Sequence, residues 1–173
     1  GTPVTVDRIY DTAGRMTAQY SPLVRTSTGD VRVVNLFTYD GNGNMTSKTV
    51  ASATISGATT TTNANSRTEY YFYDAAGRRG AVVGADRVLN VFTYDANGNL
   101  TSQKRHFNAI GASFNLATAT LATVLASTTA NTAMDEETTY AYDSADRMIT
   151  RTDQMGAGPG DDLGGVDPQG RRP

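Results

Sequence analysis

Two short stretches of the sequence carry enough oxygen-bearing side chains to suggest a metal site. DGNGN (Asp40–Asn44) and DANGN (Asp95–Asn99) both resemble the start of a calcium-binding EF-hand loop, in which oxygen ligands alternate along the chain. The resemblance then ends, because in the first stretch the loop glycine would fall at Met45 and the bidentate acid at Ala51. Turn formation explains the same letters, so the sequence predicts no metal ion here.

One histidine and two groups of carboxylates are the remaining candidates for catalysis. His106 lies in QKRHF on an expected strand without a nucleophile or an orienting group nearby in sequence, so we expect it to be solvated. Glycosidase chemistry needs two carboxylates in a rigid cleft, whereas Asp161 and Asp162 lie in a Gly/Pro-rich tail. The position of Asp135–Glu137 favours the end of an insertion and the start of a strand. The sequence therefore predicts no catalytic residue, no cofactor and no enzyme.

The composition favours strands and turns. Only 38% of the 173 residues are apolar and 18% are charged, and Thr, Ser, Asn and Gly make up the difference. The net charge is -2 without a basic block, which argues against a nucleic-acid partner. No apolar run is long enough to predict a membrane span, and the absence of cysteine excludes disulfides and thiol catalysis.

An eight-residue motif recurs five times along the chain. Its pattern is Tyr-Asp-x-x-Gly-(Arg/Asn)-(Met/Leu)-Thr, with departures at Arg79 and Gly80 in the third copy and Asp146 in place of glycine in the fifth. Asp, two free positions and Gly predict a type I turn followed by a left-handed residue, which is a tight β-hairpin with a G1 bulge. Because Asp146 enters that conformation at a cost, we expect the fifth hairpin to be the loosest. The residues assigned to the turns are Tyr10, Asp11, Gly14, Tyr39, Asp40, Gly43, Tyr73, Asp74, Gly77, Tyr94, Asp95, Gly98, Tyr142 and Asp143.

The turn also fixes the register of each hairpin. Each motif tyrosine should pair with the residue six positions later, and a guanidinium from Arg79 can then lie on the ring of Tyr73. Aromatic residues two positions apart, as in Phe37-Thr-Tyr39, share one face of a strand and predict an aromatic stripe, more often a packing seam than a ligand platform. The predicted pairs are Tyr10–Met16, Tyr39–Met45, Tyr73–Arg79, Tyr94–Leu100 and Tyr142–Met148, with Thr38–Thr46 and Thr93–Thr101 on the other face.

The repeats are expected to form one β-sheet segment over residues 1–152, interrupted by flexible insertions at about 49–68 and 108–136, with a flexible tail at 153–173. The second insertion favours a short helix through Leu121, Val124 and Leu125 with Asn115 as a possible cap, although its Ala-Thr alternation also fits a strand. The expected strands are Val4–Tyr10, Met16–Tyr20, Val31–Tyr39, Met45–Val50, Arg67–Tyr73, Arg78–Val83, Arg87–Tyr94, Leu100–Phe107, Glu137–Tyr142 and Arg147–Thr152.

The motif resembles the YD repeat of the RHS-repeat family, over most of Tyr10–Thr152. That family includes bacterial Rhs polymorphic toxins, shell components of Tc toxin complexes and the extracellular teneurins. The resemblance implies an all-β fold of stacked antiparallel hairpins in one twisted or spiralling sheet. It also implies a secreted or cell-surface location and a hollow shell, which encloses a C-terminal toxic segment in the bacterial members.

These features predict a structural role without catalysis, in a toxin shell or a self-assembling β strip. Open sheet edges predict pairing with other YD-repeat segments of the same or identical chains, and a homo-oligomer if the chain is complete. The alternative is an adhesin or carbohydrate-binding module that uses exposed Tyr and Arg side chains. Rhs shells often finish with a cleaved Asp-Pro-x-Gly-Leu motif, but Arg171 takes the leucine position after Asp167–Gly170, so we expect no cleavage there. The arginines near the turns are Arg15, Arg78, Arg79, Arg147 and Arg151.

Overall fold

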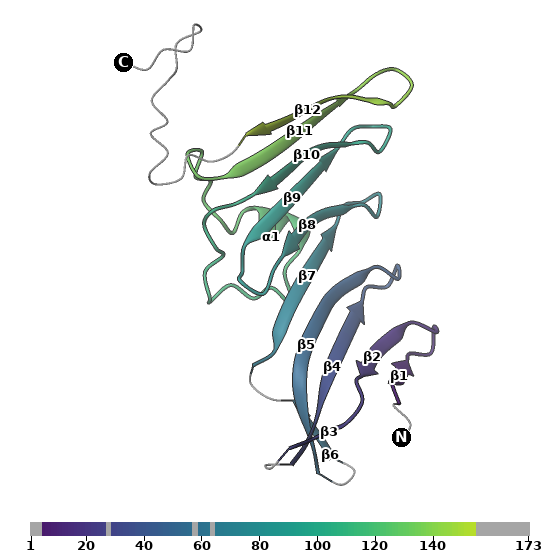
Figure 1. Cartoon of the computed structure of the whole chain (residues 1–173). Helices are drawn as coiled ribbons and strands as arrows, with labels where there is room; N and C mark the ends of the chain where they lie inside the picture. The colour runs from purple at the N-terminus through teal and green to yellow at the C-terminus, as the bar shows by residue number, and fades with distance from the viewer. Residues whose placement is uncertain (1–4, 27–28, 57–58, 63–64, 155–173) are drawn as a thin grey trace, which may run out of the picture.

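The computed structural model describes residues 5–26, 29–56, 59–62 and 65–154. Within them the chain forms one antiparallel sheet of 12 strands and one short helix, so the predicted all-β fold of stacked hairpins is confirmed (Figure 1). The elements are β1 Asp7–Tyr10, β2 Met16–Tyr20, β3 Val24–Thr26, β4 Gly29–Tyr39, β5 Met45–Ser56, β6 Thr59–Thr62, β7 Arg67–Tyr73, β8 Arg79–Val83, β9 Leu89–Tyr94, β10 Leu100–Arg105, α1 Leu121–Leu125, β11 Glu136–Tyr142 and β12 Met148–Gln154.

The hairpins lie side by side in chain order. The sheet runs β1-β2-β4-β5-β7-β8-β9-β10-β11-β12, with β3 paired to β4 and β6 paired to β5. Figure 1 shows the five motif turns projecting from the same side of the sheet. The sheet does not close, so β1 and β12 are its two outer strands.

The first predicted insertion lengthens the sheet instead of leaving it. β5 continues to Ser56, and β6 then folds back on it with Ala53 opposite Thr62. β3 pairs in the same way with the start of β4. The sequence did not predict β3 or β6, although their Thr and Val residues suit a pleated sheet. Of this predicted flexible insertion, residues 57–58 and 63–64 lie outside the described residues.

The second insertion packs across one face of the sheet. The predicted helix is confirmed as α1, but its N-cap is Thr120, which forms a capping box with Thr123. Asn115 caps nothing there; its side chain accepts a hydrogen bond from the backbone N–H of Ala117 at 3.1 Å. The sequence predicts flexibility for this segment, yet Ile110, Leu116 and Val124 are buried in the core, so these side chains hold the segment on the sheet as a cover.

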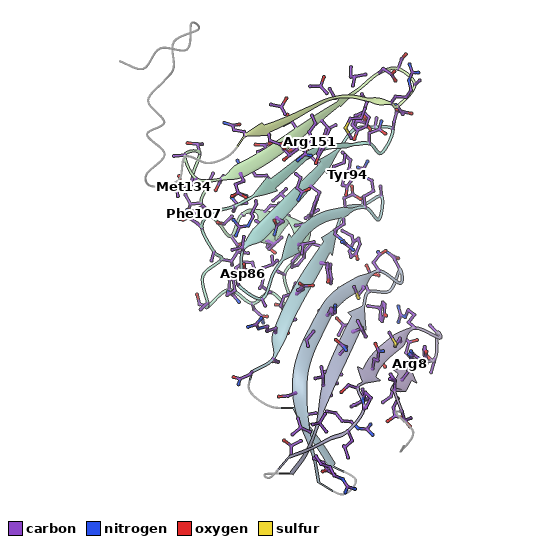
Figure 2. All side chains as sticks on the ribbon, in the orientation of Figure 1. Arg8, Asp86, Tyr94, Phe107, Met134 and Arg151 are labelled. Atoms are coloured by element: carbon purple, nitrogen blue, oxygen red, sulfur yellow. The ribbon has the colours of Figure 1, made fainter. Side chains whose placement is uncertain are left out.

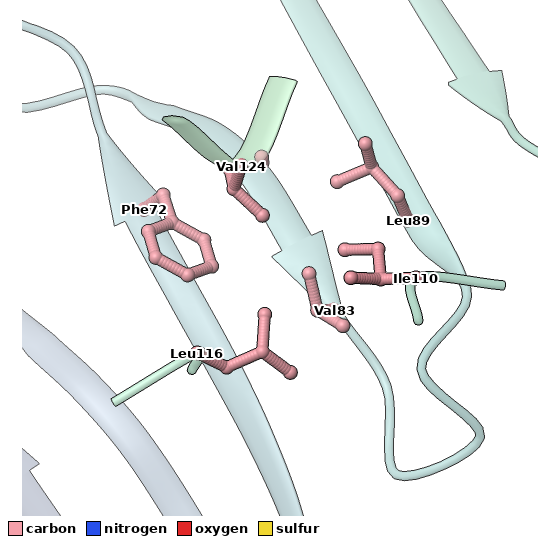
Figure 3. Close-up of a cluster of buried hydrophobic side chains, with 7 residues drawn as sticks. Phe72, Val83, Leu89, Ile110, Leu116 and Val124 are labelled. Atoms are coloured by element: carbon pink, nitrogen blue, oxygen red, sulfur yellow. The ribbon is translucent and has the colours of Figure 1, made fainter. Parts of the chain in front are cut away.

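The hydrophobic core lies between this cover and strands β7 to β9. Figure 3 shows side chains from both layers converging on one cluster. Small residues on β8 allow the close approach, and a Cβ added to Gly80 would lie 2.7 Å from a methyl group of Leu121. The cluster consists of Phe72, Ala81, Val83, Leu89, Ile110, Leu116 and Val124. No helix in the described part of the chain is long and apolar enough to cross a membrane.

Candidate functional site

The motif turns have the predicted geometry. In the second copy the Asp40 N–H donates to the Asn44 carbonyl at 2.9 Å and the Gly43 N–H donates to the Asp40 carbonyl at 3.1 Å. Gly43 has a φ of 90°, in the left-handed region where glycine carries no Cβ penalty. These bonds close a type I turn with a G1 bulge. The equivalent glycines Gly14, Gly77 and Gly98 have φ of 78°, 75° and 93°.

The side-chain oxygens of each motif aspartate accept hydrogen bonds from groups of the same turn. The Oδ1 atom of Asp40 accepts from the N–H groups of Asn42 and Asn44, and its Oδ2 accepts from the side-chain amide of Asn44 at 2.9 Å. The Asn44 amide holds the pKa of Asp40 below its usual value, and Asn99 acts alike on Asp95. The described residues contain no group of His, Asp and Glu side chains arranged to hold a metal ion. The aspartates therefore act as turn-forming groups.

The five predicted tyrosine pairs are confirmed, but a second bulge beyond each turn shifts the register. The predicted pairs Thr38–Thr46 and Thr93–Thr101 are therefore wrong in the backbone register, where Thr93 lies opposite Ser102. Thr38 pairs with Ser47 in the backbone register, while its hydroxyl also lies 2.9 Å from that of Thr46. Thr93 contacts the Thr101 hydroxyl in the same way, at 3.2 Å. The pairs are Tyr10–Met16, Tyr39–Met45, Tyr73–Arg79, Tyr94–Leu100 and Tyr142–Met148.

The motif tyrosines form a ladder of hydrogen bonds between neighbouring hairpins. In every copy after the first, the tyrosine hydroxyl donates to the main-chain carbonyl of the seventh motif residue in the preceding copy. Figure 2 shows one of these side chains, Tyr94, close to the turn end of the sheet. The aromatic stripe is therefore a packing seam, as the sequence predicts. The bonds are Tyr39 to Met16 at 2.8 Å, Tyr73 to Met45 at 2.9 Å, Tyr94 to Arg79 at 3.0 Å and Tyr142 to Leu100 at 2.9 Å.

The sixth motif residue alternates between arginine and asparagine, and the two types make different contacts. Arg15 Nε contacts Asp11 of its own turn at 2.7 Å, while its Nη1 donates to the Asp40 carbonyl of the next hairpin at 2.9 Å. The guanidinium carbon also lies 4.9 Å from the centre of the Tyr39 ring. Asn44 is too short for this reach and bonds within its own turn.

The second arginine copy repeats the first. Arg78 bonds Asp74 at 2.8 Å, donates to the Asp95 carbonyl at 2.9 Å and covers the Tyr94 ring at 4.8 Å. The sequence predicts that such arginines partner an aspartate on the facing strand, and the pairs Arg15–Asp11 and Arg78–Asp74 confirm it. The contact that the sequence did not predict is the one with the next hairpin, to which the Nη1 atom of each arginine donates.

The fifth turn replaces the motif glycine with Asp146, which adopts a φ of 58°. Its carboxylate accepts hydrogen bonds from the side-chain amides of Asn97 at 2.9 Å and Asn99 at 2.7 Å. Both donors belong to the fourth hairpin. Asp146, whose left-handed backbone is unfavourable for a residue with a Cβ, therefore links the fifth hairpin to the fourth. That this hairpin is the loosest stays a prediction.

The sequence predicts that the Arg79 guanidinium lies on the ring of Tyr73, and this prediction is wrong. The guanidinium lies 4.9 Å from the centre of the Tyr71 ring, the diagonal neighbour on the same face. Burial and a hydrogen bond from the Tyr71 hydroxyl to Glu69 at 2.7 Å raise the pKa of Tyr71 to about 12. This tyrosine is therefore a protonated hydrogen-bond donor.

The side chain of His106 is largely withdrawn from solvent, so the prediction of a solvated strand histidine is wrong. Only 12% of its side chain is exposed, it lies just after β10, and its Nδ1 lies 3.3 Å from Oδ2 of Asp135. Burial acts to raise the pKa of Asp135, but N–H donors from Phe107 and Asn131 outweigh it and hold that pKa below its usual value. Asp135 thus closes the second insertion, and β11 begins directly after it, as predicted.

Arg87 is the structural residue that the sequence did not reveal. It occupies the left-handed position of the β8–β9 turn with a φ of 64°. Its side chain donates to the carbonyls of Ile110, Gly111 and Phe114 at 2.9, 2.6 and 2.8 Å, and its own carbonyl accepts from the Ile110 N–H. The turn therefore anchors the start of the cover. Asp161, Asp162 and Asp167–Gly170 lie outside the described residues.

Comparisons with known proteins find similarity among solved structures. No family model and no curated protein matches the chain. Among solved structures, the chain is similar to part of the crystal structure of TcdB2-TccC3-Cdc42, with 13% identity and a TM-score of 0.34. The match covers 88% of this chain, which spans 9% of the length of that solved chain.

Proposed function

We propose that this chain is a structural YD-repeat segment, part of an encapsulating toxin shell or of a self-assembling extracellular β strip, with no catalysis of its own. The observation that carries the proposal is the use of the motif's side chains. Tyr39, Tyr73, Tyr94 and Tyr142 all donate to the backbone of a neighbouring hairpin. Groups that are engaged in holding hairpins together favour a shape-forming role over a binding role.

The proposed partners are further YD-repeat segments and, in a shell, an enclosed C-terminal toxic segment. A secreted or cell-surface location follows from the resemblance to Rhs and teneurin-like repeats. The open order of the sheet supports the first partner, because outer strands invite pairing with a strand of matching pattern. Repeat arrays also derive their stability from contacts between neighbours.

A glycan-binding adhesin is the second candidate. A hollow of about 350 Å³ favours it, lined by two cationic side chains, one carboxylate and two apolar residues. The motif tyrosines do not line it, and their hydroxyls are donated to the main chain. The hollow therefore lies apart from the repeat seam. Its lining residues are Lys48, Val50, Arg67, Glu69 and Ala85.

The two candidates separate in one experiment that measures stability and ligand binding together. Tyr73→Phe should lower the free energy of unfolding by about 1 kcal/mol, because it removes one hydrogen bond, while a glycan array stays at the background of an unrelated β protein. Arg67→Ala, beside the hollow, is the matched variant for the adhesin. Glycan binding by the unmodified chain that disappears in Arg67→Ala would overturn the structural assignment.

A further inference from the structure

The first strand of the sheet carries half of an inter-hairpin contact. Tyr10 stands at the motif position that donates to the preceding hairpin in the other four copies. Within the described residues no strand lies beyond β1, and 55% of Tyr10 is exposed. Its neighbour Ile9 is 50% exposed. This edge therefore presents a hydroxyl donor and an apolar side chain without a partner strand.

The last strand carries the other half. Arg147 contacts its own aspartate, Asp143, at 2.8 Å, as the two other motif arginines do. Its side chain is nevertheless 80% exposed, against 33% for Arg15 and 34% for Arg78, which cover the next hairpin. Met148, at the position whose carbonyl accepts the tyrosine hydroxyl, is 54% exposed. Among the residues described up to 154, no following hairpin supplies this edge with an aspartate carbonyl and a tyrosine ring.

The register between hairpins is constant, so the geometry of a further junction is defined. At each of the four junctions the residue two after the seventh motif position lies opposite the residue three before the next motif tyrosine. The same rule places Thr150 of β12 opposite Asp7 of β1, and Met148 opposite Ile9. The observed pairs are Ala18–Leu36, Ser47–Tyr70, Ala81–Val91 and Ser102–Thr139.

We propose that β12 of one copy of this chain binds β1 of a second copy, head to tail, in the register of the internal junctions. Tyr10 of the second copy donates to the Met148 carbonyl, while Arg147 covers that tyrosine's ring and donates to the Asp11 carbonyl. The proposal rests on the structural function above and names its partner. Because the two edges differ, the contact is heterologous and generates open chains of copies.

Two variants, each blocked at one edge, test this directly. The double variant Ile9→Lys/Tyr10→Lys places positive charges on β1, opposite Arg147 of the other copy. The double variant Met148→Lys/Ile149→Lys places positive charges on β12, where Ile149 is 64% exposed. Each variant alone should sediment as a monomer. An equimolar mixture should form a 1:1 heterodimer and stop there, because one free edge remains on each variant. The unmodified chain should form oligomers whose mass rises with concentration.

A third variant keeps the test independent of those edge charges. Arg147→Asn retains the bond to the turn aspartate that Asn44 and Asn99 make, but it loses the reach to a second copy. It should weaken association of the chain about tenfold, equivalent to about 1.4 kcal/mol, without lowering its thermal stability. Circular dichroism confirms that each variant is folded.

Three outcomes overturn the proposal: an unmodified chain that stays monomeric at every concentration, a single-edge variant that still self-associates, or an Arg147→Asn variant that associates unchanged. The structural function is judged separately by the effect of Tyr73→Phe on the stability of the monomer. A stable dimer formed by one edge variant alone would indicate pairing of like edges.

Discussion

Tyr73 of the third hairpin donates a hydrogen bond to the main-chain carbonyl of Met45 in the second hairpin, over 2.9 Å. The two residues belong to copies of one motif, at its first and seventh positions. The acceptor is a main-chain carbonyl, which every residue type has. The seventh motif position can therefore be Met, Arg or Leu without loss of the bond. The motif thus contains both the donor and the acceptor that join one hairpin to the next.

Tyr73→Phe tests this hydrogen bond at an internal junction between two hairpins. Removing the hydroxyl should lower the free energy of unfolding by about 1 kcal/mol, because the Met45 carbonyl loses a donor at a half-buried site. Urea denaturation followed by circular dichroism measures the change. Tyr10→Phe is the matched control at the exposed first copy and should leave a dilute, monomeric sample unchanged. Equal losses in both variants would contradict the ladder.

Arg78→Asn tests the reach of the arginine copies. The variant turn resembles those of Asn44 and Asn99, so the local turn survives, but the bond to the Asp95 carbonyl and the cover over the Tyr94 ring disappear. We expect a loss of about 1–2 kcal/mol in the free energy of unfolding, also from urea titration. Arg147→Asn, with no following hairpin in the described chain, should cost far less. The reverse ranking would show that arginine acts only within its turn.

Arg87 allows backbone strain and side-chain anchoring to be separated. Arg87→Gly removes the cost of the left-handed backbone but also three hydrogen bonds to the cover, whereas Arg87→Ala loses the bonds and keeps the strain. Arg87→Ala should be less stable than Arg87→Gly by about 1 kcal/mol. Both should speed hydrogen exchange at the Ile110 N–H, which donates to the Arg87 carbonyl. Unchanged exchange at Ile110 would show that Arg87 does not anchor the cover.

Leu116→Ala tests whether the second insertion is part of the core. Leu116 is 5% exposed within the cluster, so truncation should leave a cavity and cost about 2–5 kcal/mol in thermal or urea unfolding. Leu125→Ala is the matched control, because Leu125 lies on α1 with 42% of its surface exposed. If both variants unfold with the stability of the unmodified chain, the cover is dispensable.

Acid should unfold the sheet, because the turns hold the pKa of every motif aspartate below its usual value. A carboxyl with a lowered folded-state pKa contributes stability that is present above its unfolded pKa of about 3.9 and is lost as pH falls through the folded value. Circular dichroism between pH 7 and pH 2 should therefore be constant to about pH 4 and report unfolding below it. Asp74→Asn should reduce this dependence on pH. Stability that rises below pH 4 would contradict the role of the turns.

Local features of the molecule follow from its sequence. Asp, two free positions and Gly dictate the turn, the turn dictates the register, and the register places Tyr39 opposite Met45. These relations span eight residues, so backbone geometry alone decides them. The all-β fold and the packing seam follow from repeating such a unit. The sequence did not predict strands β3 and β6 because they span only 3 and 4 residues, too few to show the alternation that marks a strand.

Contacts between distant segments were settled only in three dimensions. Leu116 and Val124 sit among Thr and Ala residues without a strong periodic pattern, yet they pack on Phe72, more than forty positions earlier. His106 lies beside Asp135 because the insertion between them folds back across the sheet. Tyr73 finds the Met45 carbonyl because stacking brings two turns into one plane of the sheet.

The sequence by itself determined the hairpin, its register and its repetition, since each depends on φ/ψ preferences and hydrogen bonds within one motif. The tertiary structure decided which groups join the hairpins, which face is covered and which edges stay open. Those outcomes depend on the free energy of burying side chains from remote parts of the chain against one another, which no local pattern records.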